Sequence, residues 1–126
     1  MGEDASITAA EWEVMEALWS ASRPATSAEI VAAVGSRQDW TEATVRTLLF
    51  RLSKKGVVDS KRDGRRFLYS PRIAREDYVG GEADRFVDRM FGGKLAPLVA
   101  QFAKRDKLSV EEIERLEALL KDLRND

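Results

Sequence analysis

The chain contains no cysteine and no histidine. The missing thiols exclude disulfides and thiolate chemistry, and the missing imidazoles exclude acid–base catalysis by histidine. A zinc finger or a similar transition-metal site would lack its usual ligands. Catalysis would have to depend on carboxylates, lysines and hydroxyls, so we expect no enzyme activity, no metal site and no cofactor.

Long apolar runs are also missing. A helix that spans a membrane needs about 18 or more consecutive apolar residues, and the sequence has no such run. The first residues, "MGEDASITAAEW", are acidic and lack the basic and then apolar pattern of a secretory signal. We therefore expect a cytoplasmic protein without membrane insertion.

The charge of the chain is unevenly distributed. Of the 126 residues 44% are hydrophobic, which predicts one compact domain or a small domain with an appendage, and the net charge is only −1. Residues 1–35 carry one basic and six acidic side chains, residues 36–72 carry ten and four, and residues 73–126 carry ten and twelve, so the segments have net charges of −5, +6 and −2. The basic middle segment is typical of a surface that attracts a polyanion, although a solvated charged surface would have the same composition.

Two helices are predicted from capping signals near the N-terminus. Thr8 and Thr26 each stand three residues before a glutamate, which is the spacing of a capping box at a helix start. The first predicts a helix at about 9–20 with an apolar face. The second predicts a helix at about 27–35 that ends at Gly35.

A third helix is predicted from the N-cap candidate Thr41 to about Lys55, with Gly56 as its stop. One face of this helix is apolar and is expected in the core, with Val45, Leu48, Leu49 and Leu52. The opposite face combines small, hydroxyl, aromatic and basic side chains. Its members are Ala43, Arg46, Thr47, Phe50, Arg51 and Lys54, with Thr44 at the flank near the N-terminal end.

A β-hairpin is predicted over residues 57–70. Two extended runs, which begin at Val57 and at Phe67, flank the dipeptide Asp63-Gly64, which favours a tight hairpin turn. The tip of this hairpin carries the basic residues Lys61, Arg62, Arg65 and Arg66.

Three helices followed by a basic hairpin is the order of elements in a winged helix-turn-helix. In that fold the third helix enters the DNA major groove, and the hairpin, or wing, lies along the backbone. A generic three-helix domain with an incidental hairpin is the alternative. We expect DNA contacts from the cap residue Thr41, from the outward face of the third helix and from the basic hairpin tip.

The outward residues differ in what they can contact. Ala43 allows a close approach to base edges, Arg46 can bind guanine through two hydrogen bonds, and Thr47 suits a base edge or a thymine methyl. The basic side chains of the hairpin are expected to contact phosphates or the minor groove. Phe50 has two interpretations: it stacks on thymine methyls or a sugar edge, or it packs under the wing against Tyr69.

Residues 73–126 predict three further helices. Gly92-Gly93 ends the first, and Ser109 caps the last at 110–124. These helices have too few apolar side chains to bury themselves, so we expect them to pack against the same segment of a second chain; folding back onto the N-terminal helices is the alternative. The expected dimerisation residues are Phe86, Met90, Leu95, Leu98, Phe102, Ile113, Leu116, Leu120 and Leu123.

The expected fold class is therefore mainly α with a small β-hairpin. Residues 1–72 form an N-terminal winged helix-turn-helix, and residues 73–126 form a C-terminal helical dimerisation region. Two other function classes are weaker. A winged helix used for protein–protein contact would not favour so basic a hairpin tip. Paired acids such as Glu111 and Glu112 are more simply the N-terminal charges of a helix than an enzyme site.

The chain resembles the penicillinase repressor family, BlaI/MecI, with its copper-responsive CopY branch. The stretches that carry the resemblance cover most of residues 7–120 in the same order: "ITAAEWEVMEALW", "SAEIVAAV", "TEATVRTLLFRLSKKGVV", "FLYSP" and "MFGGKLAPLVAQFAKRDKLSVEEIERLEALL". The resemblance implies a homodimeric repressor that occupies a palindromic operator in double-stranded DNA. The CopY branch carries a C-terminal cysteine cluster, which this chain lacks, so copper sensing is not expected.

The resemblance also implies a switch. In the β-lactam branch, derepression follows cleavage by a membrane-bound sensor protease or by a protease that depends on it. The peptide bond that is cleaved in this family lies between Asn and Phe. The corresponding bond here is Gln101–Phe102, where Gln101 departs from the pattern.

Overall fold

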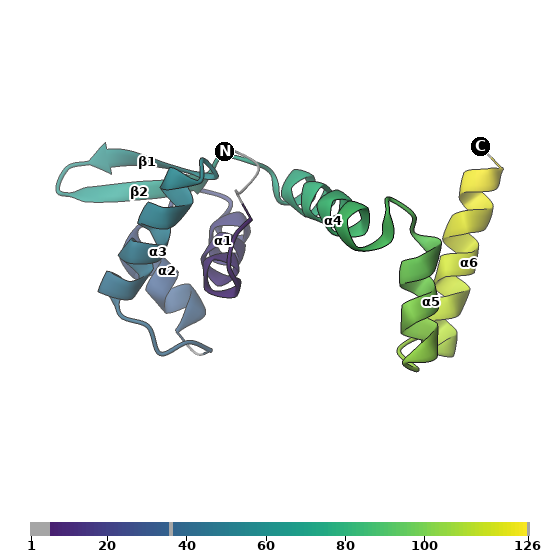
Figure 1. Cartoon of the computed structure of the whole chain (residues 1–126). Coiled ribbons are helices and arrows are strands. Elements are labelled where there is room, and N and C mark those ends of the chain that lie inside the picture. The colour runs from purple at the N-terminus through teal and green to yellow at the C-terminus, as the bar shows by residue number, and fades with distance from the viewer. Residues whose placement is uncertain (1–5, 36, 126) are drawn as a thin grey trace. The chain divides into compact units, whose positions relative to one another are not determined.

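The computed structural model describes residues 6–35 and 37–125 and contains six helices and one hairpin in those ranges (Figure 1). The elements follow in the order α1 (Ala9–Ala21), α2 (Ser27–Val34), α3 (Glu42–Lys54), β1 (Val58–Asp63), β2 (Arg66–Pro71), α4 (Arg75–Phe91), α5 (Ala96–Lys104) and α6 (Val110–Arg124). The predicted fold class, mainly helical with a small antiparallel hairpin, is confirmed.

The helix starts follow the predicted capping signals. The hydroxyl of Thr8 accepts a hydrogen bond from the backbone N–H of Glu11 at 3.1 Å, and the Glu11 carboxylate accepts one from the N–H of Thr8 at 2.9 Å. Thr26 and Glu29 form the same pair of bonds at 3.1 and 2.9 Å. Both capping boxes are therefore confirmed. The helix ends agree with the sequence because these bonds depend only on residues three apart.

The hydrophobic core lies between α1, α2, α3 and the start of β1. The predicted core face of α3 is confirmed, because Val45, Leu48, Leu49 and Leu52 are all buried. They pack in one cluster with side chains of α1, α2, the first strand and the residue before that strand, namely Val14, Met15, Leu18, Ile30, Val58 and Val57. This packing holds α3 with one side inward and leaves its other side free.

An ion pair joins the end of α3 to the first turn of α1. The Lys55 ammonium lies 2.5 Å from a carboxylate oxygen of Glu11, whose side chain is only 1% exposed. Lys55 also donates to the backbone oxygen of Ser6 at 3.0 Å. Burial raises the pKa of Glu11, but the bonds from Lys55 and Thr8 outweigh it and leave that pKa below its ordinary value. The pair therefore fixes α3 against α1 from outside the apolar cluster.

The hairpin has its turn one residue later than predicted. Asp63 pairs with Arg66, so the two turn residues are Gly64 and Arg65 rather than Asp63 and Gly64. Gly64 has a φ of 66°, while Arg65 keeps a negative φ. Positive φ at the first central position only is the pattern of a type II′ turn, which glycine favours there. The Asp-Gly signal located the turn but not its register.

A third segment pairs with the hairpin. Ala25, between α1 and α2, exchanges two backbone hydrogen bonds with Tyr69, at 2.9 and 2.8 Å. This single bridge ties β2 to the helical part of the unit. The sequence carries no signal for it, because one paired residue has no periodicity.

Contacts within the chain define two compact units, up to Gly80 and from Gly81 onward. The division falls within α4 because the start of that helix packs on α1. Tyr78 is buried, and its ring packs at a tilt against Trp12 and Trp19 with ring centroids 6.0 and 6.1 Å away. Arg75 binds Glu16 through two bonds of 3.0 Å, and these bonds hold the pKa of Glu16 below its ordinary value.

The second unit contains the rest of α4 together with α5 and α6. Gly92 and Gly93, which end α4, have φ angles of 61° and 83°, as expected of a glycine stop. Ser109 caps α6 by accepting from the N–H of Glu112 at 3.1 Å. No side chain among residues 81–125 is buried in this chain alone. None of the helices within the described ranges combines the length and the apolar character that crossing a bilayer requires.

Candidate nucleic-acid interface

The outward side of α3 is exposed along its whole length. All the residues that sequence analysis assigned to it are exposed: Thr41, Ala43, Thr44, Arg46, Thr47, Phe50, Arg51 and Lys54. The structure brings them together because the four buried side chains opposite leave α3 no other orientation. The result is a polar and basic helix face on a rigid support.

Local hydrogen bonds order the N-terminal part of this face. Thr41 caps the helix and accepts from the N–H of Thr44 at 3.2 Å. The Thr47 hydroxyl donates to the backbone oxygen of Ala43 at 3.1 Å. The N–H of Thr44 is used by the Thr41 cap, and the N–H groups of Glu42 and Ala43 before it can receive an anion, as at other helix N-termini.

One acidic residue on this face was missed by sequence analysis. Glu42 binds Arg46 at 2.7 Å and also accepts from the hydroxyl of Ser27 at 3.2 Å. An exposed pair of this kind contributes only about 0–1 kcal/mol. Arg46 can therefore leave Glu42 for a stronger acceptor at little cost. The spacing of four residues between the two was the signal in the sequence.

The basic residues of the hairpin divide between its two faces. Side chains alternate along a strand, so Ser60 and Arg62 share one face with their partners Tyr69 and Phe67. That face is turned toward α3, because Ser60, Phe67 and Tyr69 line a recess together with residues of the helix. Lys61 stands on the other face. Only part of the predicted basic tip therefore faces the same side as α3.

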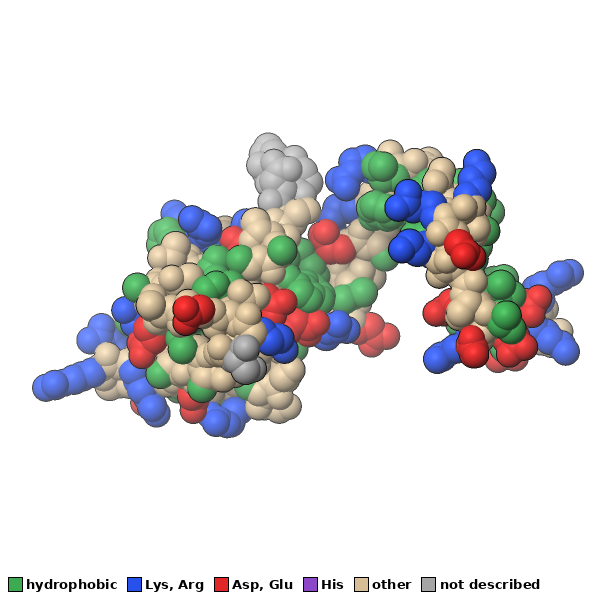
Figure 2. Space-filling model, turned by 90° about the horizontal axis from the view of Figure 1, so that it is seen from below, with side chains coloured by type: hydrophobic (Ala, Val, Ile, Leu, Met, Phe, Trp, Pro, Cys, Tyr) green, Lys and Arg blue, Asp and Glu red, His purple; other side chains and the backbone are tan. Residues whose placement is uncertain are grey.

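The basic side chains of the hairpin also differ in whether they already have a partner within the chain. Arg66 pairs with Asp63 at 3.1 Å, and the guanidinium of Arg62 lies 5.6 Å from the ring centre of Phe67. Within the described residues, Lys61 and Arg65 form no ion pair, so their charges are open to a phosphate. Figure 2 keeps the left–right order of Figure 1 and shows lysine and arginine side chains projecting at the left end of the N-terminal unit, where the hairpin lies.

A recess of about 320 Å³ separates α3 from the hairpin. It is lined by Arg46, Phe50, Ser53, Ser60, Phe67 and Tyr69. Phe50 is 62% exposed, so the wing does not cover it, and the interpretation that places it beneath the wing is not supported. The Lys54 ammonium lies 5.4 Å from the centre of the Phe50 ring. The recess thus has aromatic walls and a cationic rim.

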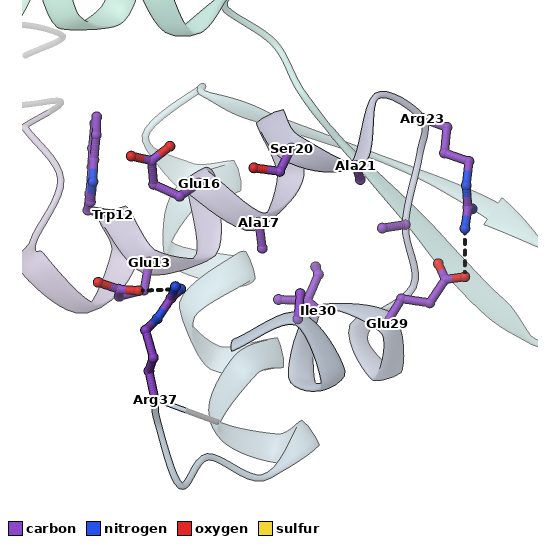
Figure 3. Close-up of a pocket in the computed structure, with 12 residues that line it drawn as sticks. Trp12, Glu13, Glu16, Ala17, Ser20, Ala21, Arg23, Glu29, Ile30 and Arg37 are labelled. Carbon is purple, nitrogen blue, oxygen red and sulfur yellow. Dashed lines mark hydrogen bonds and ion pairs between the residues drawn. The ribbon is translucent and has the colours of Figure 1, made fainter. Parts of the chain in front are cut away.

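A second depression, of about 690 Å³, lies between α1 and α2 (Figure 3). Its carboxylates are already paired: Glu13 with Arg37 at 3.0 Å and Glu29 with Arg23 at 3.3 Å. Glu16 is held by an arginine of α4, as described above. This depression therefore offers no unpaired charge for a ligand. Across the ranges that the structure describes, no three acidic side chains gather in a way that would hold a metal ion.

The expected dimerisation residues present an apolar surface in the second unit. Leu98 and Leu116 are half-buried, and the remaining members are exposed: Phe86, Met90, Leu95, Phe102, Ile113, Leu120 and Leu123. Val110 and Leu119 of α6 are exposed as well and were missed, although Val110 stands three residues before Ile113 and Leu119 three residues after Leu116. The Gln101–Phe102 bond lies inside α5, with both side chains exposed.

Comparison with known proteins places this geometry in a family. The family model described as "Penicillinase repressor" matches residues 7–122. The chain is 35% identical over 119 residues to the penicillinase repressor of Bacillus licheniformis, covering 94% of this chain and 92% of the relative. It is 34% identical over 114 residues to the methicillin resistance regulatory protein MecI of Staphylococcus aureus, covering 90% and 92%.

A solved structure is similar to the N-terminal unit. It is described as the DNA-binding domain of the repressor BlaI, and it matches with 35% identity and a TM-score of 0.52 over 59% of this chain and 89% of that one. The family model and both relatives extend over nearly the whole length, including the C-terminal helices. The chain therefore belongs to the penicillinase repressor family.

Proposed function

We propose that this protein is a homodimeric transcriptional repressor that binds a palindromic operator through α3 and the hairpin. The observation that carries the proposal is the outward face of α3: a basic helix face, fixed by a buried apolar face, beside a basic hairpin. One relative is named a penicillinase repressor and another a methicillin resistance regulatory protein, and the similar solved structure is described as the DNA-binding domain of a repressor. The alternative of a winged helix used for protein contact is not favoured by these relatives.

The two basic elements have different tasks in this proposal. Arg46, Thr47 and Ala43 lie toward the N-terminal half of α3, and they contact base edges in the major groove. Thr41 and Thr44 stand at the helix start, where the backbone N–H groups receive a phosphate. The remaining basic side chains contact phosphates and so add affinity and salt dependence. They are Arg51, Lys54, Lys61, Arg62, Arg65 and Arg66.

Selection of duplex DNA from a random pool, followed by footprinting, tests this function. A palindrome is expected, with half-sites about 34–36 Å apart, because two identical reading heads must enter the groove on one side of the helix. If a dimer makes about 8 phosphate contacts, affinity should fall by about three to five orders of magnitude between low and moderately raised salt. A chain that retains no duplex in dilute buffer would contradict the proposal.

Dimerisation is proposed through α4 to α6. Residues 81–125 bury none of their side chains in the single chain. Their leucines and phenylalanines are left in contact with water, which is unfavourable by about 25 cal/mol for each Å² of apolar surface. A second copy would supply the same apolar residues to cover them. The spacing of Ile113, Leu116, Leu120 and Leu123 on α6 is typical of a narrow helix–helix seam.

Release by proteolysis is the second part of the proposal, as a cut at Gln101–Phe102. A protease needs extended backbone, and α5 is poorly protected against local unfolding. In the single chain it has nine residues, no side-chain hydrogen bond at its N-cap and no buried residue. Helices shorter than about 12–15 residues are marginal without tertiary packing. The cut would remove α6 and separate the two reading heads, which then lose the benefit of binding together.

A further inference from the structure

The aromatic surface between α3 and the hairpin is unusual for a face that is otherwise polar and basic. Phe50 is 62% exposed and Phe67 is 43% exposed, and both line the recess with Tyr69. Neither ring serves the core, which the buried side of α3 already fills. An exposed phenylalanine has no use for solubility, so the recess is best explained by an apolar group that enters it from outside.

The rim of the recess limits what that group can belong to. Arg46 lines it directly, Lys54 lies over the Phe50 ring and Arg62 lies over the Phe67 ring. The hydroxyls of Ser53 and Ser60 complete the lining. Arg46 is paired with Glu42, but within the described residues Lys54 and Arg62 form no ion pair, and an apolar partner surface would leave these two cations without counter-charge. The occupant must therefore be an apolar group carried by a polyanion.

Duplex DNA offers one such group on its base edges. In the major groove, the C5-methyl of thymine is the apolar feature that distinguishes its base pair. Phe50 lies on the same helix face as Arg46 and Thr47, four and three residues further along α3, so it enters the groove with them.

We propose that the recess receives the methyl group of a thymine in each half-site, with Phe50 as the residue that reads it. This inference rests on the proposed function, because it assumes that α3 lies in the major groove. It adds a sequence preference that hydrogen bonds alone would not produce. Phe67 and Tyr69 form the opposite wall, so the hairpin takes part in base reading as well as in phosphate binding.

Deoxyuridine provides the test, because it differs from thymidine only by the missing methyl. With the full chain and the selected operator, each thymine is replaced in turn, in both half-sites together, and affinity is measured by fluorescence anisotropy. At one position, the wild type should lose about fourfold in affinity per half-site and about 14-fold in total. One buried methyl at about 0.8 kcal/mol corresponds to that factor.

The variant Phe50→Ala should bind the thymine and deoxyuridine operators equally at that position. Since Phe50 is exposed, this variant should fold, and a thermal melt checks that it does. Lys54→Ala is the matched control on the same face. It should weaken both operators by the same factor and keep the methyl preference.

The outcomes are separable. If no deoxyuridine substitution weakens the wild type, or if Phe50→Ala keeps the wild-type preference, the recess does not read a methyl and the inference is wrong. A variant Phe50→Ala that binds weakly beside a wild type indifferent to deoxyuridine would assign Phe50 to a sugar contact and also overturn the inference. The proposed function survives each of these results, whereas a failure to select any duplex would overturn both.

Discussion

Lys55→Met should destabilise the N-terminal unit by about 3 kcal/mol at neutral pH. The Glu11 carboxylate is 1% exposed and would keep the N–H of Thr8 at 2.9 Å but lose the ammonium at 2.5 Å. Removing one partner of a buried pair costs about 3–5 kcal/mol, because the other charge stays buried without compensation. Lys55 itself is 25% exposed, which favours the lower end of that range. Against a typical total of about 5–15 kcal/mol, the loss is large.

The loss should depend on pH in a definite direction. In the wild type the pKa of Glu11 is lowered, so its ionised form stabilises the fold above the ordinary carboxyl pKa, and that contribution disappears as the pH falls through the lowered value. In Lys55→Met, burial is no longer offset by the lysine, and the pKa of Glu11 should rise. Protonation then relieves the variant first. The difference between the two proteins should shrink as the pH falls from about 7 to about 4.

Urea unfolding followed by tryptophan fluorescence measures this difference. All three tryptophans, Trp12, Trp19 and Trp40, lie in the N-terminal unit, so the signal reports on that unit alone. Protein concentration must be kept constant, because association would change apparent stability. Lys54→Met is the matched control, since Lys54 is exposed on the outward side of α3. It should change stability by no more than about 0.5 kcal/mol.

Two results would refute this reasoning. In the first, Lys55→Met costs no more than Lys54→Met at neutral pH, which would mean that the pair behaves like an exposed one. In the second, the cost of Lys55→Met is the same at every pH, which would mean that Glu11 does not titrate with the predicted shift.

Three further predictions concern DNA and assembly. Arg46→Ala should cost about 1–3 kcal/mol of binding free energy on the selected operator and relax the sequence specificity at one base pair. Arg65→Ala should weaken binding to all sequences alike and reduce the slope of log affinity against log salt concentration by about one. Binding titrations on operator and random duplexes distinguish the two variants. Leu120→Glu places a charge in the α6 seam of each copy, so sedimentation equilibrium should show a single chain while the melt of the N-terminal unit is unchanged; a persistent dimer would disprove the assigned interface. Incubation with the cognate sensor and its inducer should give one cut at Gln101–Phe102 by mass spectrometry. An uncut chain that still releases DNA would rule out the cleavage mechanism.

Local signals predicted most of the elements. The N-caps Thr8, Thr26 and Thr41 located three helices to within about one residue, because cap bonds join residues three apart. The heptad-like spacing predicted helix α6, and the glycine pair predicted the end of α4, because these signals also depend on residues close in sequence. The hairpin turn was misplaced by one residue, since Asp-Gly favours a turn without deciding which pair closes it.

The candidate site was predicted in its membership but not in its arrangement. Helical periodicity was enough to assign the outward residues of α3, because a buried face determines its opposite face. Strand alternation already places Lys61 and Arg62 on opposite faces of the wing, but it could not show which of these faces is turned toward α3, since that depends on how the hairpin packs on the helices. The sequence also left Phe50 undecided between two interpretations, and only the position of the hairpin showed the ring exposed beside Phe67.

The sequence by itself determined the helices, the inward and outward sides of α3 and the basic character of the middle segment. These properties arise from neighbours within a few residues, so they do not depend on tertiary contacts. Only the tertiary structure decided that Glu11 would meet Lys55, that Ala25 would pair with Tyr69 and that Tyr78 would join the N-terminal unit. Each of these contacts joins residues more than 40 positions apart, and their separation is closed only when the hydrophobic core brings distant segments together.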